Sequence, residues 1–186
     1  MSLTMNMVGG GGKSRKYIIR DGVLKIGSIV SAAKKGSSSS SFAPAQPPYS
    51  IETGYIRFGW TSGLSSGSAA GMVYIDQKVD FSAYTKLCYR GRFVFNTNGN
   101  FSYVNCSFES WTNIGTYAND NQIFIFPINC AANMDANTAL STDWTGVREI
   151  DLSQYANRTD SYVGFYLCHD SNSSYGYAEI TDIWLE

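Results

Sequence analysis

The chain has 186 residues, a formal net charge of −1 and a charged fraction of 16%, which is low against the roughly 25% of an average soluble domain. This length allows one domain with a real core, and the near-zero net charge excludes an overall attraction to nucleic acid or to an anionic membrane. Thirteen Tyr, ten Phe and four Trp accompany 18 Gly, a composition typical of strands joined by tight turns.

The N-terminal segment, residues 1–16, contains four consecutive glycines, and we expect a flexible tail because ordering such a run costs much conformational entropy. It lacks a basic region followed by an apolar run, so no signal peptide is predicted. Residues 17–186 are predicted to form a single β-sandwich domain. Within it, Asp21-Gly22 between two apolar runs predicts a two-residue hairpin turn, and the Ser- and Pro-rich residues 34–48 predict a loop.

In the rest of the chain, apolar and polar residues alternate in short segments, at 55–60, 86–95 and 101–109. This period of two is typical of half-buried antiparallel strands. Residues 123–128 are apolar on both faces, and Pro127 indicates an edge strand or a bulge, because proline cannot donate to a sheet. No segment has a sustained helical period, so little helix is expected.

Two stretches, KVDFSAYTKLCYRGRF at 78–93 and EIDLSQYANRTDSYVGFYL at 149–167, repeat one pattern: aliphatic, Asp, large apolar, Ser, any residue, Tyr. Asp and Ser at this spacing can hydrogen-bond nearby backbone N–H groups, and the apolar residue can plug the end of a core. Two such corners with several strands between them predict an antiparallel two-sheet β-sandwich of the jelly-roll type. The predicted structural corner residues are Asp80, Ser82, Tyr84, Asp151, Ser153 and Tyr155.

Two matches to catalytic or nucleotide-binding motifs lack the required context. MVGGGGKS at 7–14 approaches a phosphate-binding loop, but a strand rather than a helix follows it. GLSSG at 63–67 matches a nucleophile elbow, yet it lies in a Gly- and Ser-rich run, and His169 is the only histidine available as a base. We therefore predict no nucleotide site, and no catalytic residue such as a Ser65–His169 pair.

Metal binding is also not predicted. The four cysteines are widely separated without a C-x-x-C spacing, which argues against zinc; free thiols are favoured, although two disulfides are arithmetically possible. Asp170, Asn172 and Ser174 could offer oxygens to Ca²⁺, but the spacing lacks the Gly and terminal Glu of a calcium loop, and a turn is the better interpretation.

The high number of aromatic residues says more about function than these motifs do, because alternation or loop position places several of the aromatic residues outside the core. Exposed Trp and Tyr rings can stack on the apolar faces of sugars, while Asn, Asp and Arg supply hydrogen bonds. The same rings would also suit an interface between subunits. The candidate ligand-binding residues are Trp111, Tyr117, Trp144 and Tyr175.

The two corner segments and the ending AEITDIWLE resemble jelly-roll sandwiches of the galactose-binding and carbohydrate-binding-module type. Together with MVGGGGK and YIIRDG, they resemble minor structural, tail-associated proteins of bacteriophages and prophages of gram-positive gut bacteria. The resemblance covers residues 17–186 and implies a sandwich fold, with no catalytic residue to carry over. A calcium ion often braces carbohydrate-binding modules, but no acidic cluster here matches that site, so no cofactor is expected.

The prediction is therefore a non-enzymatic binding or attachment module of a phage or prophage particle or of a bacterial surface, with a cell-surface glycan as ligand. A purely structural virion subunit or oligomerisation domain is the alternative, with other virion proteins or further copies of the chain as partners. A hydrolase is least favoured, since no spacing selects a catalytic pair among the carboxylates Glu52, Glu109, Asp120, Asp143 and Glu179.

We expect the protein to be associated with the virion after synthesis in the bacterial cytoplasm, with the cell surface or the extracellular space as the alternative. No nucleic-acid or membrane partner is expected, since the chain has neither a basic stripe nor an apolar run of about 20 residues.

Overall fold

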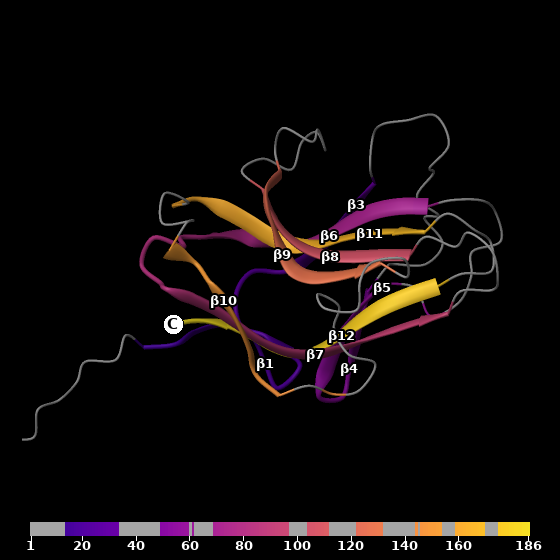
Figure 1. Cartoon of the computed structure of the whole chain (residues 1–186), viewed down its shortest axis with the longest axis horizontal. Coiled ribbons are helices and arrows are strands. Elements are labelled where there is room, and N and C mark those ends of the chain that lie inside the picture. Colours follow the sequence, from indigo (N-terminus) through magenta and orange to yellow (C-terminus); the bar gives the residue numbers. More distant parts are fainter. Residues whose placement is uncertain are drawn as a thin grey trace, which may run out of the picture.

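The strands of this protein form two antiparallel sheets that lie face to face, as a computed structural model of the chain shows (Figure 1). The structure describes residues 14–33, 49–59, 61, 69–96, 104–111, 122–131, 144, 146–153, 159–169 and 175–186. Within these residues there is no α-helix. The predicted all-β sandwich is therefore confirmed.

The sheets differ in size. Sheet A has seven strands among the described residues: β1 (Lys16–Arg20), β2 (Val23–Leu24), β4 (Tyr49–Glu52), β5 (Tyr55–Gly59), β7 (Lys86–Asn96), β10 (Arg148–Asp151) and β12 (Tyr175–Leu185). Sheet B has five: β3 (Ile29–Ala33), β6 (Ala69–Val79), β8 (Val104–Trp111), β9 (Gln122–Ala131) and β11 (Ser161–His169).

The strands from β5 to β12 wind as a jelly roll. Their order is β5-β12-β7-β10 in sheet A and β6-β11-β8-β9 in sheet B. The first strand of this series therefore pairs with the last, the second with the next to last, and so on inward to β8 and β9. This is the pattern of a long antiparallel ribbon folded over into two sheets, which is the predicted topology.

The N-terminal hairpin docks where β12 changes its partner. Residues 177–180 of β12 pair with β5, whereas residues 183–185 pair with β1. Asp21 and Gly22 form the two-residue turn between β1 and β2, with φ of 53° and 70°, as predicted for a type I′ turn. A Cβ atom on Gly22 would lie 2.1 Å from the backbone nitrogen of Tyr55, so only glycine fits.

Apolar residues that alternate along the strands fill the space between the sheets. In β5, Ile56 and Phe58 are buried while Arg57 points to the other face, as the alternation predicts. The ring of Phe58 stacks on that of Phe165 in β11, which joins sheet A to sheet B through the core. The largest fully buried side chains are Phe81, Phe93, Phe165, Ile18, Ile19, Ile56 and Leu87.

The two Asp-x-Ser segments lie at points where the chain changes sheets. Residues 80–85 connect β6 in sheet B to β7 in sheet A, and residues 152–160 connect β10 to β11 in the opposite direction. In the first segment, the backbone N–H and the hydroxyl of Ser82 donate to Asp80 Oδ1 at 2.8 and 2.6 Å. Phe81 is fully buried between them, and Tyr84 is partly buried against the core.

The second segment repeats this geometry: the backbone N–H of Ser153 donates to Asp151 Oδ1 at 2.8 Å, and Leu152 between them is fully buried. Its Leu152 N–H also donates to the carbonyl of Thr85 in the first segment, at 2.8 Å. The two corners are therefore neighbours at one end of the sandwich. Tyr155 lies outside the described residues.

Pro127 lies on β9, which is an edge strand of sheet B among the described strands. The register between β8 and β9 shifts at this point, because Ser107 pairs with Asn129 whereas Glu109 pairs with Ile125. Three residues of β9 thus oppose one residue of β8. The structure confirms that the proline marks an edge strand with a bulge.

Candidate functional site

The candidate ligand-binding residues that the structure describes lie on different sheets and at different ends of the sandwich. Trp111 ends β8 opposite Tyr162, on sheet B and toward the corner end of the sandwich. Tyr175 begins β12 opposite Asn96, on sheet A and toward the other end. Tyr117 lies outside the described residues. Trp144 is described with its side chain: it is 45% exposed and contacts the outer face of sheet A.

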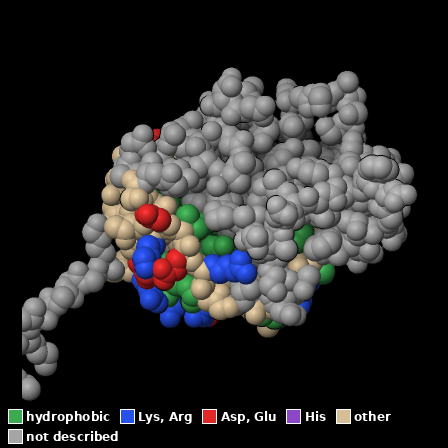
Figure 2. All heavy atoms as spheres, viewed as in Figure 1, with side chains coloured by type: hydrophobic (Ala, Val, Ile, Leu, Met, Phe, Trp, Pro, Cys, Tyr) green, Lys and Arg blue, Asp and Glu red, His purple; other side chains and the backbone are tan. Residues whose placement is uncertain are grey.

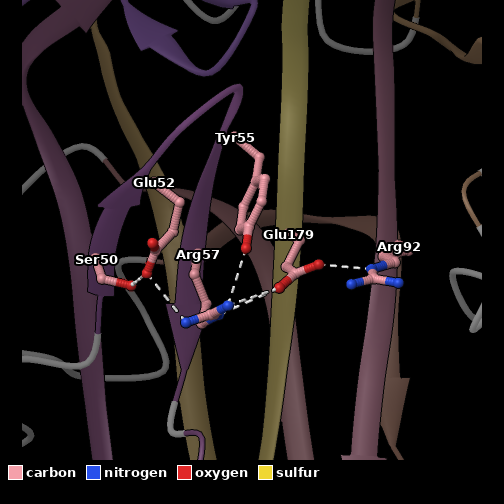
Figure 3. A network of polar contacts seen from close by, with 6 residues as sticks. All are labelled: Ser50, Glu52, Tyr55, Arg57, Arg92 and Glu179. Atoms are coloured by element: carbon pink, nitrogen blue, oxygen red, sulfur yellow. Dashed lines mark hydrogen bonds and ion pairs between the residues drawn. The ribbon is translucent and has the colours of Figure 1, made fainter.

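A row of charged side chains crosses the outer face of sheet A beside Trp144. The register places Glu179 of β12 opposite Arg57 of β5 on one side and opposite Arg92 of β7 on the other. Because Ala178 and Ile180 point into the core, alternation turns Glu179 outward between the two arginines. Figure 3 shows this arrangement, with Glu179 bridging its neighbours.

The Glu179 carboxylate is the acceptor that holds both arginines. Arg57 donates to Oε1 of Glu179 from Nη2 at 3.0 Å and from Nε at 3.2 Å, and Arg92 donates to Oε2 from Nε at 2.5 Å. A second carboxylate, Glu52, accepts from Nη1 of Arg57 at 3.1 Å and from the Ser50 hydroxyl at 2.8 Å. The row therefore contains two positive and two negative charges, with every carboxylate in it hydrogen-bonded.

Burial makes this row rigid. The Glu179 side chain is only 1% exposed, whereas Arg57 is 20% and Arg92 33% exposed, so the two cations shield the anion from water. Burial alone would lower the pKa of Arg57, but the hydrogen bond with Glu179 and the nearby negative charges raise that pKa above its ordinary value. A buried carboxylate is tolerated only when it is paired in this way.

Aromatic rings border the charged row. The guanidinium carbon of Arg92 lies 5.0 Å from the ring centre of Trp144, and that of Arg57 lies 4.9 Å from the ring centre of Tyr177. The Tyr55 ring is 5.8 Å from the Trp144 ring, and its hydroxyl accepts from Arg57 Nη2 at 3.0 Å. We call this surface the Trp144 face; it consists of Tyr55, Arg57, Arg92, Trp144, Tyr177 and Glu179.

The groups of the Trp144 face can make stacking contacts and hydrogen bonds with a ligand. It offers an exposed indole ring, guanidinium N–H donors and tyrosine rings on strands that a shared carboxylate holds together. Ring faces beside fixed polar groups are typical of sites for ligands that have both apolar and hydroxylated surfaces. The two candidate hydrolase carboxylates that are described with side chains, Glu52 and Glu179, both pair with Arg57 instead of facing each other across a cleft.

A second polar cluster lies farther along the outer face of sheet A. Figure 2 shows basic and acidic side chains close together on the described part of the surface. Cys88, Glu149 and Glu186 each present one potential metal-ligand atom, and these atoms lie within 4.8 Å of one another. Lys86 Nζ is 2.6 Å from Glu149 Oε2, and Arg15 Nε is 2.8 Å from Glu186 Oε2. Both carboxylates are therefore neutralised by the protein's own cations.

The other residues that the sequence offers for catalysis or metal binding are only partly described. Ser65 lies outside the described residues, and His169 is placed by its backbone, at the end of β11 opposite Ala69 and Val104. Asp120, Asp143 and the residues 170–174 also lie outside the described part of the chain.

The roles of Arg57, Arg92 and Glu179 were not predicted from the sequence. Alternation correctly places both arginines on the outer face of their strands. The position of Glu179 between the apolar residues Ala178 and Ile180 was the available signal, because a carboxylate in a central strand requires a partner. Its partners are 122 and 87 residues away in the chain, so local patterns do not identify them.

No protein-family model matches this chain, and neither does any curated protein. In the described part of the chain, no helix has the length and apolar character needed to cross a bilayer.

Proposed function

We propose that this protein is a non-enzymatic binding or attachment module, that its ligand is a glycan, and that the Trp144 face binds it. The observation that carries the proposal is the 45% exposed Trp144 ring beside the fixed Arg57–Glu179–Arg92 row. The Trp144 ring lies beside Tyr55, and tryptophan and tyrosine rings that offer apolar area together with a polar group are suited to an interaction surface.

A sugar matches this surface in two respects. The apolar C–H face of a pyranose ring can stack on an exposed indole, and its hydroxyl groups can pair with directional donors and acceptors. The Arg57–Glu179–Arg92 row supplies guanidinium donors whose orientation is set before a ligand arrives, which reduces the entropy lost on binding. Together with Glu52 the row has no net charge, and this suits a ligand recognised by hydrogen bonds and stacking.

A glycan array followed by calorimetry tests this proposal. The wild-type protein should bind at least one glycan, and Trp144→Ala should weaken that binding by about fivefold, since a ring contact contributes about 1 kcal/mol. Val147→Ala is the matched control, because this exposed apolar residue is three positions along the chain. Absence of any glycan signal, or equal binding by the wild type and Trp144→Ala, would overturn the proposal.

The proposed setting is a phage or prophage particle or a bacterial surface. The support is the resemblance of the two corner segments and the C-terminal strand to tail-associated proteins, together with a fold that suits attachment. Several copies on one particle would convert weak individual sites into strong attachment by avidity. Identification of flanking tail or holin genes would test this setting directly.

A structural role between subunits is the second candidate, and a specific feature favours it. Ile51 on β4, a strand with a partner on one side only among the described strands, is 69% exposed. An exposed apolar residue on such a strand is suited to contact another subunit. Light scattering on the wild type and on Ile51→Lys distinguishes the roles: an oligomer that the substitution dissociates supports the structural role.

A further inference from the structure

We infer that the glycan is acidic, and that Arg92 binds a carboxylate of it through its two terminal nitrogens. This inference rests on the proposed function and adds the chemical class of the ligand. It also separates the two arginines of the Trp144 face: Arg57 is a structural member, and Arg92 is the ligand-binding one.

The hydrogen bonds of the two arginines differ. Arg57 uses Nε, Nη1 and Nη2, and its partners are Glu52, Tyr55 and Glu179. Arg92 uses only Nε, which donates to Glu179; within the described residues no hydrogen bond reaches its Nη1 or Nη2. Figure 3 shows the bridge from Nε to Glu179 and the two other nitrogens of Arg92 without a partner among the residues drawn. Four N–H donors of this guanidinium thus have no acceptor among the described residues.

The available donors of Arg92 are held in place. Its Nε is hydrogen-bonded to a carboxylate that is 99% shielded from solvent, and that carboxylate is in turn fixed by Arg57. The Trp144 ring lies against the guanidinium at 5.0 Å, and the side chain is still 33% exposed. An oriented guanidinium loses little freedom when it binds, and its paired terminal N–H groups match the two oxygens of a carboxylate.

The position of Arg92 also indicates the size of the ligand. Because the Arg92 guanidinium lies over one face of the Trp144 ring, a sugar that stacks on this ring has to use the other face. The carboxylate therefore belongs to a neighbouring sugar of the same chain. We expect an oligosaccharide that contains uronic acid to bind, and a single uronic acid to bind much more weakly.

Charge distribution supports an acidic ligand of this kind. Glu179 is buried beneath the arginines, whereas on the same face of β7 Arg92 is partly exposed and Arg90, two residues away, is exposed. A ligand that approaches the middle of the sheet therefore meets guanidinium groups before it meets carboxylates. Because Glu179 and Glu52 balance the charges of Arg57 and Arg92, recognition depends on short-range paired hydrogen bonds rather than on a long-range field.

The test uses three acidic tetrasaccharides, from galacturonan, mannuronan and hyaluronan. The methyl ester of each tetrasaccharide is its uncharged control. Titration calorimetry should show at least one acid bound about tenfold or more tightly than its ester, as expected for hydrogen bonds to a charged group. Arg92→Lys keeps the charge but removes the paired donors, so it should abolish this preference. Arg90→Lys, on the same face of the same strand, is the matched control and should keep it.

The outcomes separate the inference from the proposed function. If glycans bind, but acids and esters bind equally, the glycan-binding function stands and the acidic ligand is wrong. If an acid is preferred and Arg92→Lys retains that preference, the assignment to Arg92 is wrong. If neither these tetrasaccharides nor any glycan on the array binds, the inference of an acidic ligand and the proposed glycan-binding function are both wrong. Circular dichroism of each variant confirms that a loss of binding is not a loss of folding.

Discussion

Phe58 of β5 stacks on Phe165 of β11 with ring centroids 4.3 Å apart and an angle of 20° between the planes, so one aromatic pair links the two sheets. Both rings are buried. Phe165→Ala would remove the ring and leave a cavity, and should lower the free energy of unfolding by about 3–5 kcal/mol. Chemical denaturation monitored by tryptophan fluorescence measures this loss.

Trp144→Ala is the control for that experiment, because it also removes a large ring but from the exposed face. It should cost about 1 kcal/mol or less, which is the loss of a surface ring and its contact with Arg92. If Phe165→Ala unfolds at the same denaturant concentration as the wild type, the sheets do not depend on this aromatic pair.

The second prediction concerns the anchor of the Trp144 face. Glu179→Gln removes the charge that Arg57 and Arg92 share, and leaves two partly buried cations with a weaker acceptor. The free energy of unfolding should fall by about 2–3 kcal/mol. Glu52→Gln removes a more exposed charge and should cost only about 0.5–1 kcal/mol. Equal losses in the two variants would show that Glu179 does not anchor the row.

The third prediction concerns Gly164 in the middle of β11. A Cβ atom there would lie 2.1 Å from the carbonyl oxygen of Val73 and 2.5 Å from the Cα of Tyr74, so the adjacent strand would have to move. Gly164→Ala should therefore lower the free energy of unfolding by about 3 kcal/mol. Gly146→Ala is the matched control, since a Cβ at that position meets nothing within 4 Å. A melting temperature equal to that of Gly146→Ala would contradict the close approach of β6 and β11.

The parts of the fold that depend on local sequence were predictable. Alternation identified Phe58 as buried and Arg57 as outward within five residues of one strand, because side chains in a strand point to opposite faces in turn. The Asp21-Gly22 turn followed from its need for positive φ at two positions. Pro127 indicated an edge strand because of its missing N–H donor.

The candidate site was less predictable, because its residues meet through pairings of distant strands. Cys88 shows the difficulty: its position in β7 points outward, yet it is fully buried. Trp184 and Glu186, nearly a hundred residues later, surround it on that face. In the same way, Trp144 was predicted as exposed, but its contact with Arg92 requires a segment that returns to the sheet after β9. No local pattern contains this information.

The fourth prediction is a pH dependence at the first corner. Hydrogen bonds from the side chain and the backbone of Ser82 lower the pKa of Asp80 below its ordinary value. A depressed pKa means that Asp80 stabilises the fold above the unfolded-state pKa of about 3.9, and that this contribution is lost as the pH falls through the folded-state value. The melting temperature of Asp80→Asn should lie below that of the wild type at pH 7, and the difference should shrink below pH 4. A difference that is constant down to pH 2 would contradict this role.

The fifth prediction is an alkaline effect at Cys88. Burial, with the negative charges of Glu186 and Glu149, raises the pKa of this thiol to about 11. The folded state therefore keeps the proton, so the thiol's contribution to stability is complete below the unfolded-state pKa of about 8.5 and is lost as the pH rises toward 11. Because only the thiolate reacts, alkylation of Cys88 by iodoacetamide at pH 8.5 should be at least about tenfold slower in the folded protein than in the urea-unfolded chain. Mass spectrometry of the Cys88 peptide measures both rates, and half-maximal reactivity near pH 8.5 in the folded protein would show that the thiol is not buried among these carboxylates.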